Sequence, residues 1–532
     1  MKIESANALR PRVIGIAAVY LGLAMMVFFL AFCNLDGRLF WGDEAETAVL
    51  AKNILKFGIP RVDDGVNHIS VNGYRYDERN GIWTWSPWLP QYLTAASLAV
   101  FGPDTWAGRA PFAFIGWLSV VVLGVVAWKI YRSHRVALAC MLLLGTSEVF
   151  LLHIRQCRYY SIIVLGEILV VYGMYQALAK NKAGPWFILT GLLLQFYCTY
   201  ISALANVPVL LVLLFNLFRQ KNSARYPLII ALGTWVMLSL PWLLYTEAWR
   251  QESAETHATF LYFVQFYSSQ FHFHFLPWCV VLLPAGGWLF HRFSRDPSIT
   301  RQLPYDLSRF EKYLVLLMLL YLPVLGIVPL VYSRYLLPLL PVAILLAAVW
   351  LFRYIRWTGV AVMVLILQCT TNIFAVASAP FGHHPWRSPL ADFVRSSMQP
   401  YDDRFSDVLK FLKPQIQPGD VLVSWDPELP LVFYTPVKLA DARLTGPPSN
   451  RLPDWILPQS ASGLLDQPPV PLQDLFKPYY ETIILTVHNS PRSGNLPEPD
   501  YYQYQSAKAA SSFVIYRLKK DASVEKTPSV KP

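Results

Sequence analysis

Two carboxylates stand directly after the first long apolar run of the sequence. Asp43 and Glu44 open a stretch, residues 41–55, whose apolar positions recur with helical spacing up to Gly58. Acidic groups at a membrane surface can accept a proton from a hydroxyl, or hold a divalent cation beside a phosphate. The alternative is structural, with Asp43 as the N-cap of the helix and Glu46 closing a capping box. Taken alone, the pattern favours the structural interpretation.

Three arginines lie in short turns between apolar runs, namely Arg155, Arg158 and Arg334. Guanidinium groups in such turns can bind a phosphate through charge-assisted hydrogen bonds. The alternative is that they reach to lipid headgroups or pair with acidic loop residues.

Three histidines, His257, His272 and His274, lie in one segment between apolar runs. Imidazole nitrogens are frequent ligands of zinc and related ions. However, the alternation of His272, Phe273 and His274 is also typical of an element at a membrane interface, where histidines usually need no metal. A divalent metal, Zn²⁺, Mg²⁺ or Mn²⁺, is the only cofactor that the sequence indicates, since a Gly-rich phosphate loop is missing.

The composition is that of a membrane protein. Of 532 residues, 55% are hydrophobic and 15% are charged, whereas soluble chains carry about 25% charged residues. The net charge is +11, but the basic residues are scattered between apolar stretches, which argues against a nucleic-acid partner. The six cysteines include no Cys-x-x-Cys pair, so neither a zinc ribbon nor a disulfide framework is indicated.

Eleven apolar runs are candidate membrane spans. The first lacks a cleavage site and should remain as a membrane helix. Glu167 falls inside one run, where an ionisable group is either functional or protonated and hydrogen-bonded between helices. The runs are residues 13–32, 111–130, 136–152, 159–180, 185–200, 202–218, 227–245, 276–290, 313–330, 336–352 and 358–376.

Basic residues fall in alternate loops, which predicts the orientation because such loops stay cytoplasmic. The amino terminus joins them, so an odd number of spans places the carboxyl terminus outside the inner (plasma) membrane. The turns that carry Arg155, Arg158 and Arg334 then face outward, where topology gives no reason for cations. The cytoplasmic set is Lys129, Arg132, Arg135, Lys180, Lys182, Arg219, Lys221, Arg225, Arg292, Arg295, Arg301, Arg309, Arg353 and Arg356.

A change of composition near residue 380 predicts two domains. Residues 1–379 form the membrane domain, with residues 34–110 as its first extracytoplasmic loop, and residues 380–532 form a soluble extracytoplasmic domain. In the latter, residues 405–412 read as a helix and residues 421–424, 480–487 and 512–518 as strands. A small α/β domain is expected.

The first loop resembles that of the GT-C superfamily of glycosyltransferases, in the branch of bacterial aminoarabinose transferases and protein O-mannosyltransferases. In that family an acidic pair just beyond the first helix heads a juxtamembrane helix, as Asp43 and Glu44 do here. Four further segments resemble family elements in the same order. Residues 86–92, with the helix after them, resemble the second juxtamembrane element, and residues 104–111 resemble the entry to the second span. Residues 155–160 resemble the basic turn before the fourth span, and residues 333–338 resemble the Arg-Tyr-x-x-Pro element.

The resemblance implies a helical multipass membrane fold with about 11 spans and an extracytoplasmic carboxyl-terminal α/β domain. It also implies inverting transfer of a sugar from a polyprenyl-phosphate donor to a lipid, glycan or protein acceptor at the outer face. Asp43 would be the base, and Glu44 would support it or share a metal. The residues for the donor phosphate and substrate would be Arg155, Arg158, Tyr159, Arg334, Tyr335, Glu78 and Asp104.

In the aminoarabinose branch a histidine of a later outer loop and a glutamate of the first loop bind zinc. Glu78 with His257, His272 or His274 would be the counterparts here. This chain departs from the family at Trp85-Ser86-Pro87-Trp88, where relatives often carry Lys or His before Pro-Pro. A phosphate or metal contact expected at that place is therefore missing.

Two other functions compete with the enzyme. A transporter or flippase of lipid-linked saccharide would be expected to show paired halves and broken helices around a midplane site. A sensor would use the outer domain to bind a ligand. The long helical first loop and the acidic residues at its start favour the enzyme.

Overall fold

The structure, a computed structural model, divides into two compact units. The membrane unit comprises Met1–Cys33, Ser86–Pro90 and Ala110–Arg395, and the mixed unit comprises Asn34–Trp85, Gln91–Arg109 and Ser396–Pro532. The structure describes residues 2–68, 76–77, 80–250, 260–280, 309–326, 332–355, 357–378, 385–398, 403–424, 429–441, 452–458, 477–488 and 510–520.

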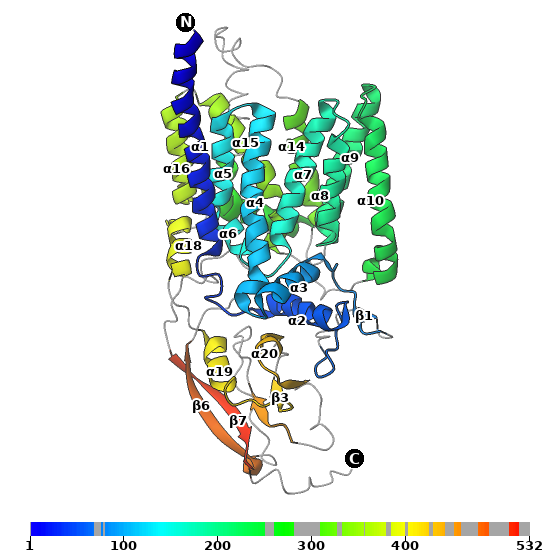
Figure 1. Ribbon diagram of the computed structural model, residues 1–532, viewed down its shortest axis with the longest axis vertical. Helices are drawn as coiled ribbons and strands as arrows, with labels where there is room; N and C mark the ends of the chain where they lie inside the picture. The colour runs from blue at the N-terminus through cyan, green and yellow to red at the C-terminus, as the bar shows by residue number, and fades with distance from the viewer. Residues whose placement is uncertain are drawn as a thin grey trace. The chain divides into compact units, whose positions relative to one another are not determined.

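Long helices run side by side in the membrane unit (Figure 1). They are α1 (Lys2–Phe32), α4 (Thr105–Tyr131), α5 (His134–Gly145), α6 (Glu148–Ile154), α7 (Tyr160–Leu178), α8 (Gly184–Phe196), α9 (Tyr200–Arg219), α10 (Arg225–Thr246), α14 (Arg309–Leu325), α15 (Leu339–Tyr354) and α16 (Thr358–Thr370). Shorter elements are η1 (Ala248–Arg250), α11 (Phe260–Gln270), the π-helical turn η2 (Phe271–Phe275), η3 (Ser333–Leu336), α17 (Ile373–Ala377) and α18 (Pro389–Met398).

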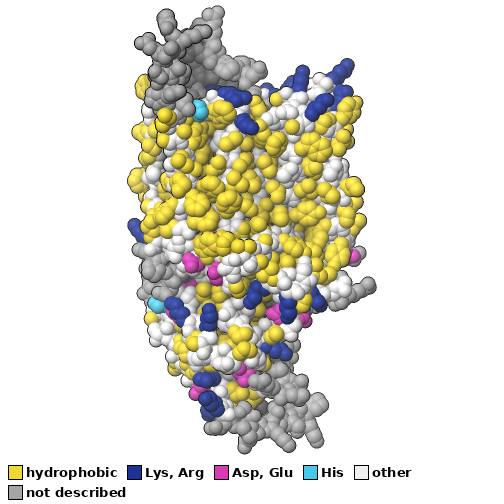
Figure 2. Space-filling view, viewed as in Figure 1, with side chains coloured by type: hydrophobic (Ala, Val, Ile, Leu, Met, Phe, Trp, Pro, Cys, Tyr) yellow, Lys and Arg dark blue, Asp and Glu magenta, His cyan; other side chains and the backbone are white. Residues whose placement is uncertain are grey.

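The helices identify a multipass membrane protein. Among the described residues, α1, α4, α7, α9 and α10 are long and apolar enough to cross a membrane, and the pair α5–α6, bent by 64°, makes a sixth. Their outer faces suit lipid, since Met237 on α10 is 75% exposed and Figure 2 shows a broad hydrophobic band over this unit. The predicted spans fall on described helices, except that 136–152 is divided between α5 and α6 and 358–376 between α16 and α17, and that 276–290 lies largely outside the described residues.

Glycines let α7 and α8 approach each other closely. A Cβ added to Gly173 would lie 2.6 Å from the carbonyl oxygen of Gly184, and one added to Gly191 would collide with the carbonyl oxygen of Gly166. Since no side chain fits there, the backbones pack directly, as small residues allow in membrane helix pairs.

The mixed unit holds a five-stranded sheet in the order β4-β3-β5-β7-β6. Strand β3 is parallel to β4 and β5, whereas β7 is antiparallel to β5 and β6. The strands are β3 (Val421–Ser424), β4 (Lys438–Asp441), β5 (Trp455–Leu457), β6 (Tyr480–His488) and β7 (Ala510–Leu518), with the helices α19 (Arg404–Leu412) and α20 (Leu429–Tyr434) and the turn η4 (Lys477–Tyr479). The predicted helix and three predicted strands of this region are confirmed.

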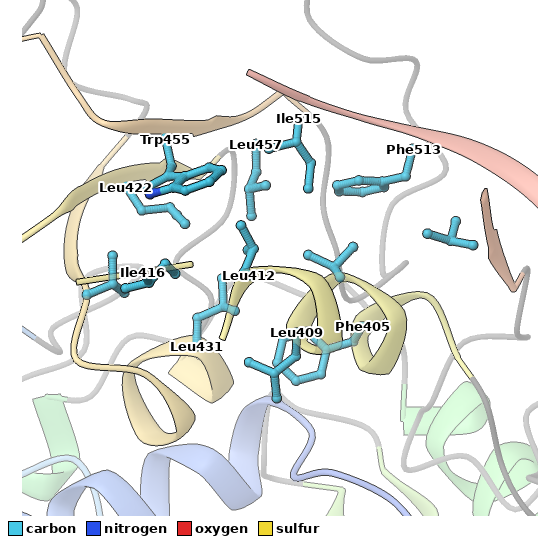
Figure 3. Packing of buried hydrophobic residues seen from close by; sticks show 13 residues of the cluster. Phe405, Leu409, Leu412, Ile416, Leu422, Leu431, Trp455, Leu457, Phe513 and Ile515 are labelled. Atoms are coloured by element: carbon cyan, nitrogen blue, oxygen red, sulfur yellow. The ribbon is translucent and has the colours of Figure 1, made fainter. Parts of the chain in front are cut away.

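Helix α19 packs its apolar face on this sheet (Figure 3). Phe405, Leu409 and Leu412 of α19 belong to one buried cluster with Trp455 and Phe513 of the sheet. The alternation of buried positions along β3 and β5 supplies the sheet side of the same core.

The rest of the mixed unit comes from the first loop. It contributes α2 (Gly42–Phe57), α3 (Leu89–Phe101) and the short pair β1 (Tyr76–Asp77) and β2 (Ile82–Trp83). Asn67 binds the edge strand, since its side-chain nitrogen donates to the carbonyl oxygen of Val437 (2.9 Å) and its side-chain oxygen accepts from the backbone N–H of Leu439 (2.6 Å). The first loop and the carboxyl-terminal region thus fold as one compact unit.

Tyr434 at the end of α20 is the second link between these segments. Its hydroxyl oxygen accepts from the backbone N–H of Phe40 (3.0 Å) and lies 2.6 Å from the hydroxyl of Thr105. Burial raises the pKa of Tyr434 to about 12, against the opposing effect of these two hydrogen bonds.

Replacing this hydroxyl should loosen the mixed unit. In Tyr434→Phe the buried N–H of Phe40 loses its acceptor, which should lower the free energy of unfolding by about 1–3 kcal/mol. Thermal unfolding of the detergent-solubilised protein measures the change. The matched control is Tyr516→Phe on β7, a half-buried residue whose change should stay within about 0.5 kcal/mol. Equal effects of the two variants would contradict the assignment.

Candidate active site

Helix α2 begins without a side-chain cap. Its N-cap residue is Trp41, in extended conformation, whose side chain forms no capping hydrogen bond. The capping-box interpretation of Asp43 and Glu46 is therefore wrong. Asp43 and Glu44 lie instead within the first turn, where the positive end of the helix dipole favours carboxylates. The predicted end is confirmed, because Gly58 closes the helix in left-handed conformation at φ 80°.

Glu44 is completely buried and forms a bidentate ion pair with Arg109. The Nε of Arg109 donates to one carboxylate oxygen at 2.8 Å and Nη2 donates to the other at 2.7 Å. The remaining donors of Arg109 bind backbone carbonyl oxygens, Nη1 those of Leu35 (2.9 Å) and Arg38 (2.8 Å), and Nη2 that of Leu39 (3.2 Å). All five N–H groups of the guanidinium are thus satisfied.

This ion pair changes the role assigned to Glu44. A buried carboxylate held by two charge-assisted hydrogen bonds supports the loop, and a metal could be shared there only by breaking the pair. Asp43, half-buried beside it, remains the candidate base.

Two other predicted residues of the first loop have different outcomes. The side chain of Asp104 accepts a hydrogen bond from the backbone N–H of Ala107 at 2.7 Å, so it caps the start of α4. Glu78 lies outside the described residues.

In the membrane unit, Arg155 caps the end of the first helix. Its Nη1 donates to the carbonyl oxygens of Leu30 (2.8 Å) and Ala31 (3.3 Å), and its guanidinium lies 5.5 Å from the centre of the Phe393 ring. Cations at a helix C-terminus are favourable. Arg155 therefore has a structural task beside any contact with a phosphate.

Arg158, Tyr159, Arg334 and Tyr335 come together in the membrane unit, from the α6–α7 turn and from η3. Both arginines interact electrostatically with Tyr159, and Tyr335 belongs to the same group. Arg334 is 8% exposed, and its guanidinium lies 4.0 Å from the centre of the Tyr332 ring. Burial raises the pKa of Tyr335, and the charge of Arg334 opposes the rise. This arginine and tyrosine cluster is the candidate phosphate site.

The histidines do not converge in the described part of the chain. His272 uses both ring nitrogens, Nδ1 accepting from the backbone N–H of Trp278 (3.1 Å) and Nε2 bonding the carbonyl oxygen of Ala375 (2.9 Å). His274 lines a pocket beside the α5–α6 break, together with Ser147 and Glu148. His257 lies outside the described residues. Within the described ranges, no three His, Cys, Asp or Glu side chains are placed to hold a metal.

Glu167 in α7 is hydrogen-bonded between helices. One of its carboxyl oxygens accepts from Gln195 of α8 at 2.7 Å and from Asn206 of α9 at 2.8 Å. The predicted hydrogen bonding of Glu167 between helices is therefore confirmed, and the network joins three membrane helices.

Arg109 is the residue that sequence reasoning missed. It precedes the predicted span 111–130, in a loop predicted to face outward, so it carries the same signal as Arg155, Arg158 and Arg334, a cation that the predicted topology does not explain.

Known proteins share this fold. A family model described as dolichyl-phosphate-mannose-protein mannosyltransferase matches residues 86–245, and no match was found among curated proteins. The solved structure of ArnT from Cupriavidus metallidurans in the apo state is similar with a TM-score of 0.57 and 16% identity, over 81% of this chain and 86% of that chain. The structure of the same protein bound to undecaprenyl phosphate gives a TM-score of 0.54 with the same identity and coverage.

The chain shares the fold of this ArnT structure. At 16% identity the likeness establishes the architecture, a helical multipass membrane protein with a sheet-containing carboxyl-terminal region. The predicted fold class is confirmed.

A double-mutant cycle tests the Glu44–Arg109 pair. Glu44→Gln and Arg109→Gln should each lower the free energy of unfolding by about 3–5 kcal/mol, because each leaves one buried charge uncompensated. The double variant should cost less than the sum of the two, since neither charge remains. Additive losses in thermal or denaturant unfolding would show that the two side chains do not form this pair.

Proposed function

We propose that this protein is a glycosyltransferase that moves a sugar from a polyprenyl-phosphate donor to an acceptor hydroxyl. The main observation is the cluster of Arg158, Tyr159, Arg334 and Tyr335, in which two arginines lie among tyrosine side chains of the membrane unit. The shared fold with a protein solved with undecaprenyl phosphate supports the same donor class. The mannosyltransferase model over residues 86–245 supports the reaction class.

The donor phosphate is the leaving group in this proposal. The acceptor oxygen attacks the anomeric carbon, the bond from that carbon to the phosphate oxygen breaks, and the sugar is transferred with inversion. Arg334 and Arg158 stabilise the charge that develops on the departing phosphate. Such cations act strongly where aromatic side chains exclude water.

Asp43 takes the proton of the acceptor hydroxyl in this scheme. It lies in the first turn of α2, next to Glu44, whose carboxylate is already neutralised by Arg109. A single base suffices, because a phosphate monoester needs no proton to leave. Lipids, glycans and proteins are all eligible acceptors.

The protein is placed in the inner (plasma) membrane with its amino terminus in the cytoplasm and its carboxyl-terminal region outside. This orientation rests on the basic residues of alternate loops. Lys129 and Arg219 lie in the last turns of α4 and α9, and Arg132 and Lys221 follow these helices. Figure 2 shows Lys and Arg gathered at one end of the membrane unit.

A transporter of lipid-linked saccharide is the second candidate. The 64° break between α5 and α6 favours it, since transporters use broken helices at their substrate sites. Purified protein that transfers no sugar from any of a set of polyprenyl-phosphate sugars, but moves a lipid-linked saccharide across vesicle membranes, would establish this function instead.

Removing the proposed base tests the enzyme function. Asp43→Asn should lower kcat about 10²–10⁴-fold, because the amide cannot accept the proton. Asp63→Asn is the matched control in the same loop, where the Asp63 carboxylate accepts from the N–H of Gly65 in a turn (2.6 Å), and it should keep its activity. Sugar transfer by purified protein measures both. Full activity of Asp43→Asn would exclude it as the base.

Removing a cation of the cluster tests the donor site. Arg334→Ala should lower kcat/KM for the sugar donor about 100-fold, whereas Arg334→Lys should recover part of it, because a point charge replaces a bidentate donor. Arg387→Ala is a matched control, since its guanidinium pairs Glu148 elsewhere in the membrane unit (2.9 Å). Unchanged donor turnover in Arg334→Ala would contradict the assignment.

A further inference from the structure

The turns that follow α7 and α9 repeat one arrangement of residues. Each contains a Lys-Asn pair, Lys180 with Asn181 and Lys221 with Asn222. Both lysines have a left-handed backbone, with φ of 64° and 50°. Both asparagine side chains accept a hydrogen bond from the backbone N–H two residues further on, at 2.9 and 2.8 Å. Glycine is the usual residue in a left-handed position after a helix, so lysine at both places points to a use for its charge.

Two hydrogen bonds join these two turns. The side-chain nitrogen of Asn222 donates to the carbonyl oxygen of Ala177 at 3.0 Å, and the hydroxyl of Ser223 donates to the carbonyl oxygen of Lys180 at 3.0 Å. Asn222 is only 2% exposed, so the contact belongs to the packed interior. The two lysines themselves are exposed and are thereby held on one surface of the membrane unit.

The joined turns carry a basic surface without acidic residues. No Asp or Glu occurs in the sequence between Glu167 and Glu247. Arg309 of α14 adds a further cation, because it donates to the side-chain oxygen of Gln220. Within the described residues, no salt bridge neutralises the basic residues of the turns. The basic surface is defined by Lys180, Lys182, Arg219, Lys221 and Arg225.

The arginines of the basic surface lie over exposed aromatic rings. The guanidinium of Arg225 is 4.7 Å from the centre of the Tyr226 ring and 5.7 Å from that of Phe218. The guanidinium of Arg219 is 5.9 Å from the centre of the Phe215 ring, and that side chain is 62% exposed. Exposed aromatic rings at the end of a membrane helix suit the boundary between hydrocarbon and headgroups. Cations directly beside apolar surface match an amphiphile with an acidic headgroup.

This surface is separate from the candidate phosphate site. Helix α7 begins directly after Tyr159 of that site and ends two residues before Lys180. Its 19 residues span about 28 Å at 1.5 Å per residue, which is close to the thickness of the hydrocarbon core, about 30 Å. A lipid at the basic surface would therefore lie in the opposite leaflet from a donor at the candidate phosphate site.

We propose that the basic surface binds the headgroup phosphate of an anionic phospholipid. Its ammonium and guanidinium groups donate charge-assisted hydrogen bonds to the phosphate oxygens, and the acyl chains lie along the apolar outer faces of α9 and α10. Basic loops can orient a membrane protein without binding any particular lipid. The paired turns instead form one defined site. This inference goes beyond the proposed function and does not depend on it.

The variant Lys180→Gly/Lys221→Gly tests the site. It removes two charges and places glycine where the backbone is left-handed, so the turns should keep their conformation. The dissociation constant of short-chain phosphatidylglycerol, measured by thermophoresis on the purified full-length protein, should rise about 30-fold, because each basic residue near an anionic lipid contributes about fivefold. Lys180→Asn/Lys221→Asn should give the same loss, since asparagine also accepts this backbone.

A matched control removes two charges from the same end of the membrane unit. Lys129 lies in the last turn of α4, and Arg135 in α5 donates to the hydroxyl of Thr358 at 3.1 Å. Lys129→Gln/Arg135→Gln should change the dissociation constant less than about threefold, because exposed charges beyond the site are screened. Arg334→Ala should leave it unchanged, which separates this site from the donor site.

Short-chain phosphatidylcholine and inorganic phosphate are the comparison probes. The wild-type protein should bind phosphatidylglycerol at least about tenfold more tightly than either, because only that lipid combines a net negative headgroup with acyl chains. Equal losses in the two double-charge variants would show a diffuse surface charge and overturn the site. Equal binding of phosphatidylcholine, or of inorganic phosphate, would overturn the anionic phospholipid as its ligand.

Discussion

The buried ion pair between Glu44 and Arg109 is the interaction on which the mixed unit depends. It joins the start of α2, the start of α4 and the chain that follows α1, because Arg109 also binds the carbonyl oxygens of Leu35 and Leu39. Two charges removed from water are tolerated only if every remaining donor finds an acceptor, and here each does. The position of Asp43, one residue before Glu44, follows from this constraint.

The arginines that topology does not explain serve two purposes. Arg109 and Arg155 hold backbone carbonyls near the end of α1, so they fix the chain where it leaves the membrane helix. Arg158 and Arg334 lie among tyrosines, where a guanidinium remains charged and can bind an anion. The same sequence signal thus marks both the support of the site and its candidate chemistry.

Apolar length and periodicity predicted most of the fold. The spans, the helix after Trp41 and strands such as Val421–Ser424 follow from local patterns. The pairing of Asn67 with β4 and of Tyr434 with Phe40 could not be predicted, because these contacts join segments more than 350 residues apart through one or two hydrogen bonds. No local pattern records them.

The candidate site shows the same division. The family resemblance predicted a set of donor-site residues that included Arg158, Tyr159, Arg334 and Tyr335, and the structure brings these four together. Arg155 and Asp104 of the same set cap helices instead. The structural task of Glu44 was missed, since its partner is 65 positions away. The two hydrogen bonds of His272 depend on the π-helical turn before Trp278. This geometry is rare and local sequence does not predict it, so these hydrogen bonds were not predicted.

The account is tested most directly by the anomeric configuration of the product formed by purified wild-type protein. A polyprenyl-phosphate sugar of known configuration is supplied with acceptor, and the new linkage is read by NMR. The account predicts transfer with inversion and release of one polyprenyl phosphate for each sugar moved. Retention of configuration, which requires a covalent sugar intermediate, would contradict a mechanism with one base and one displacement.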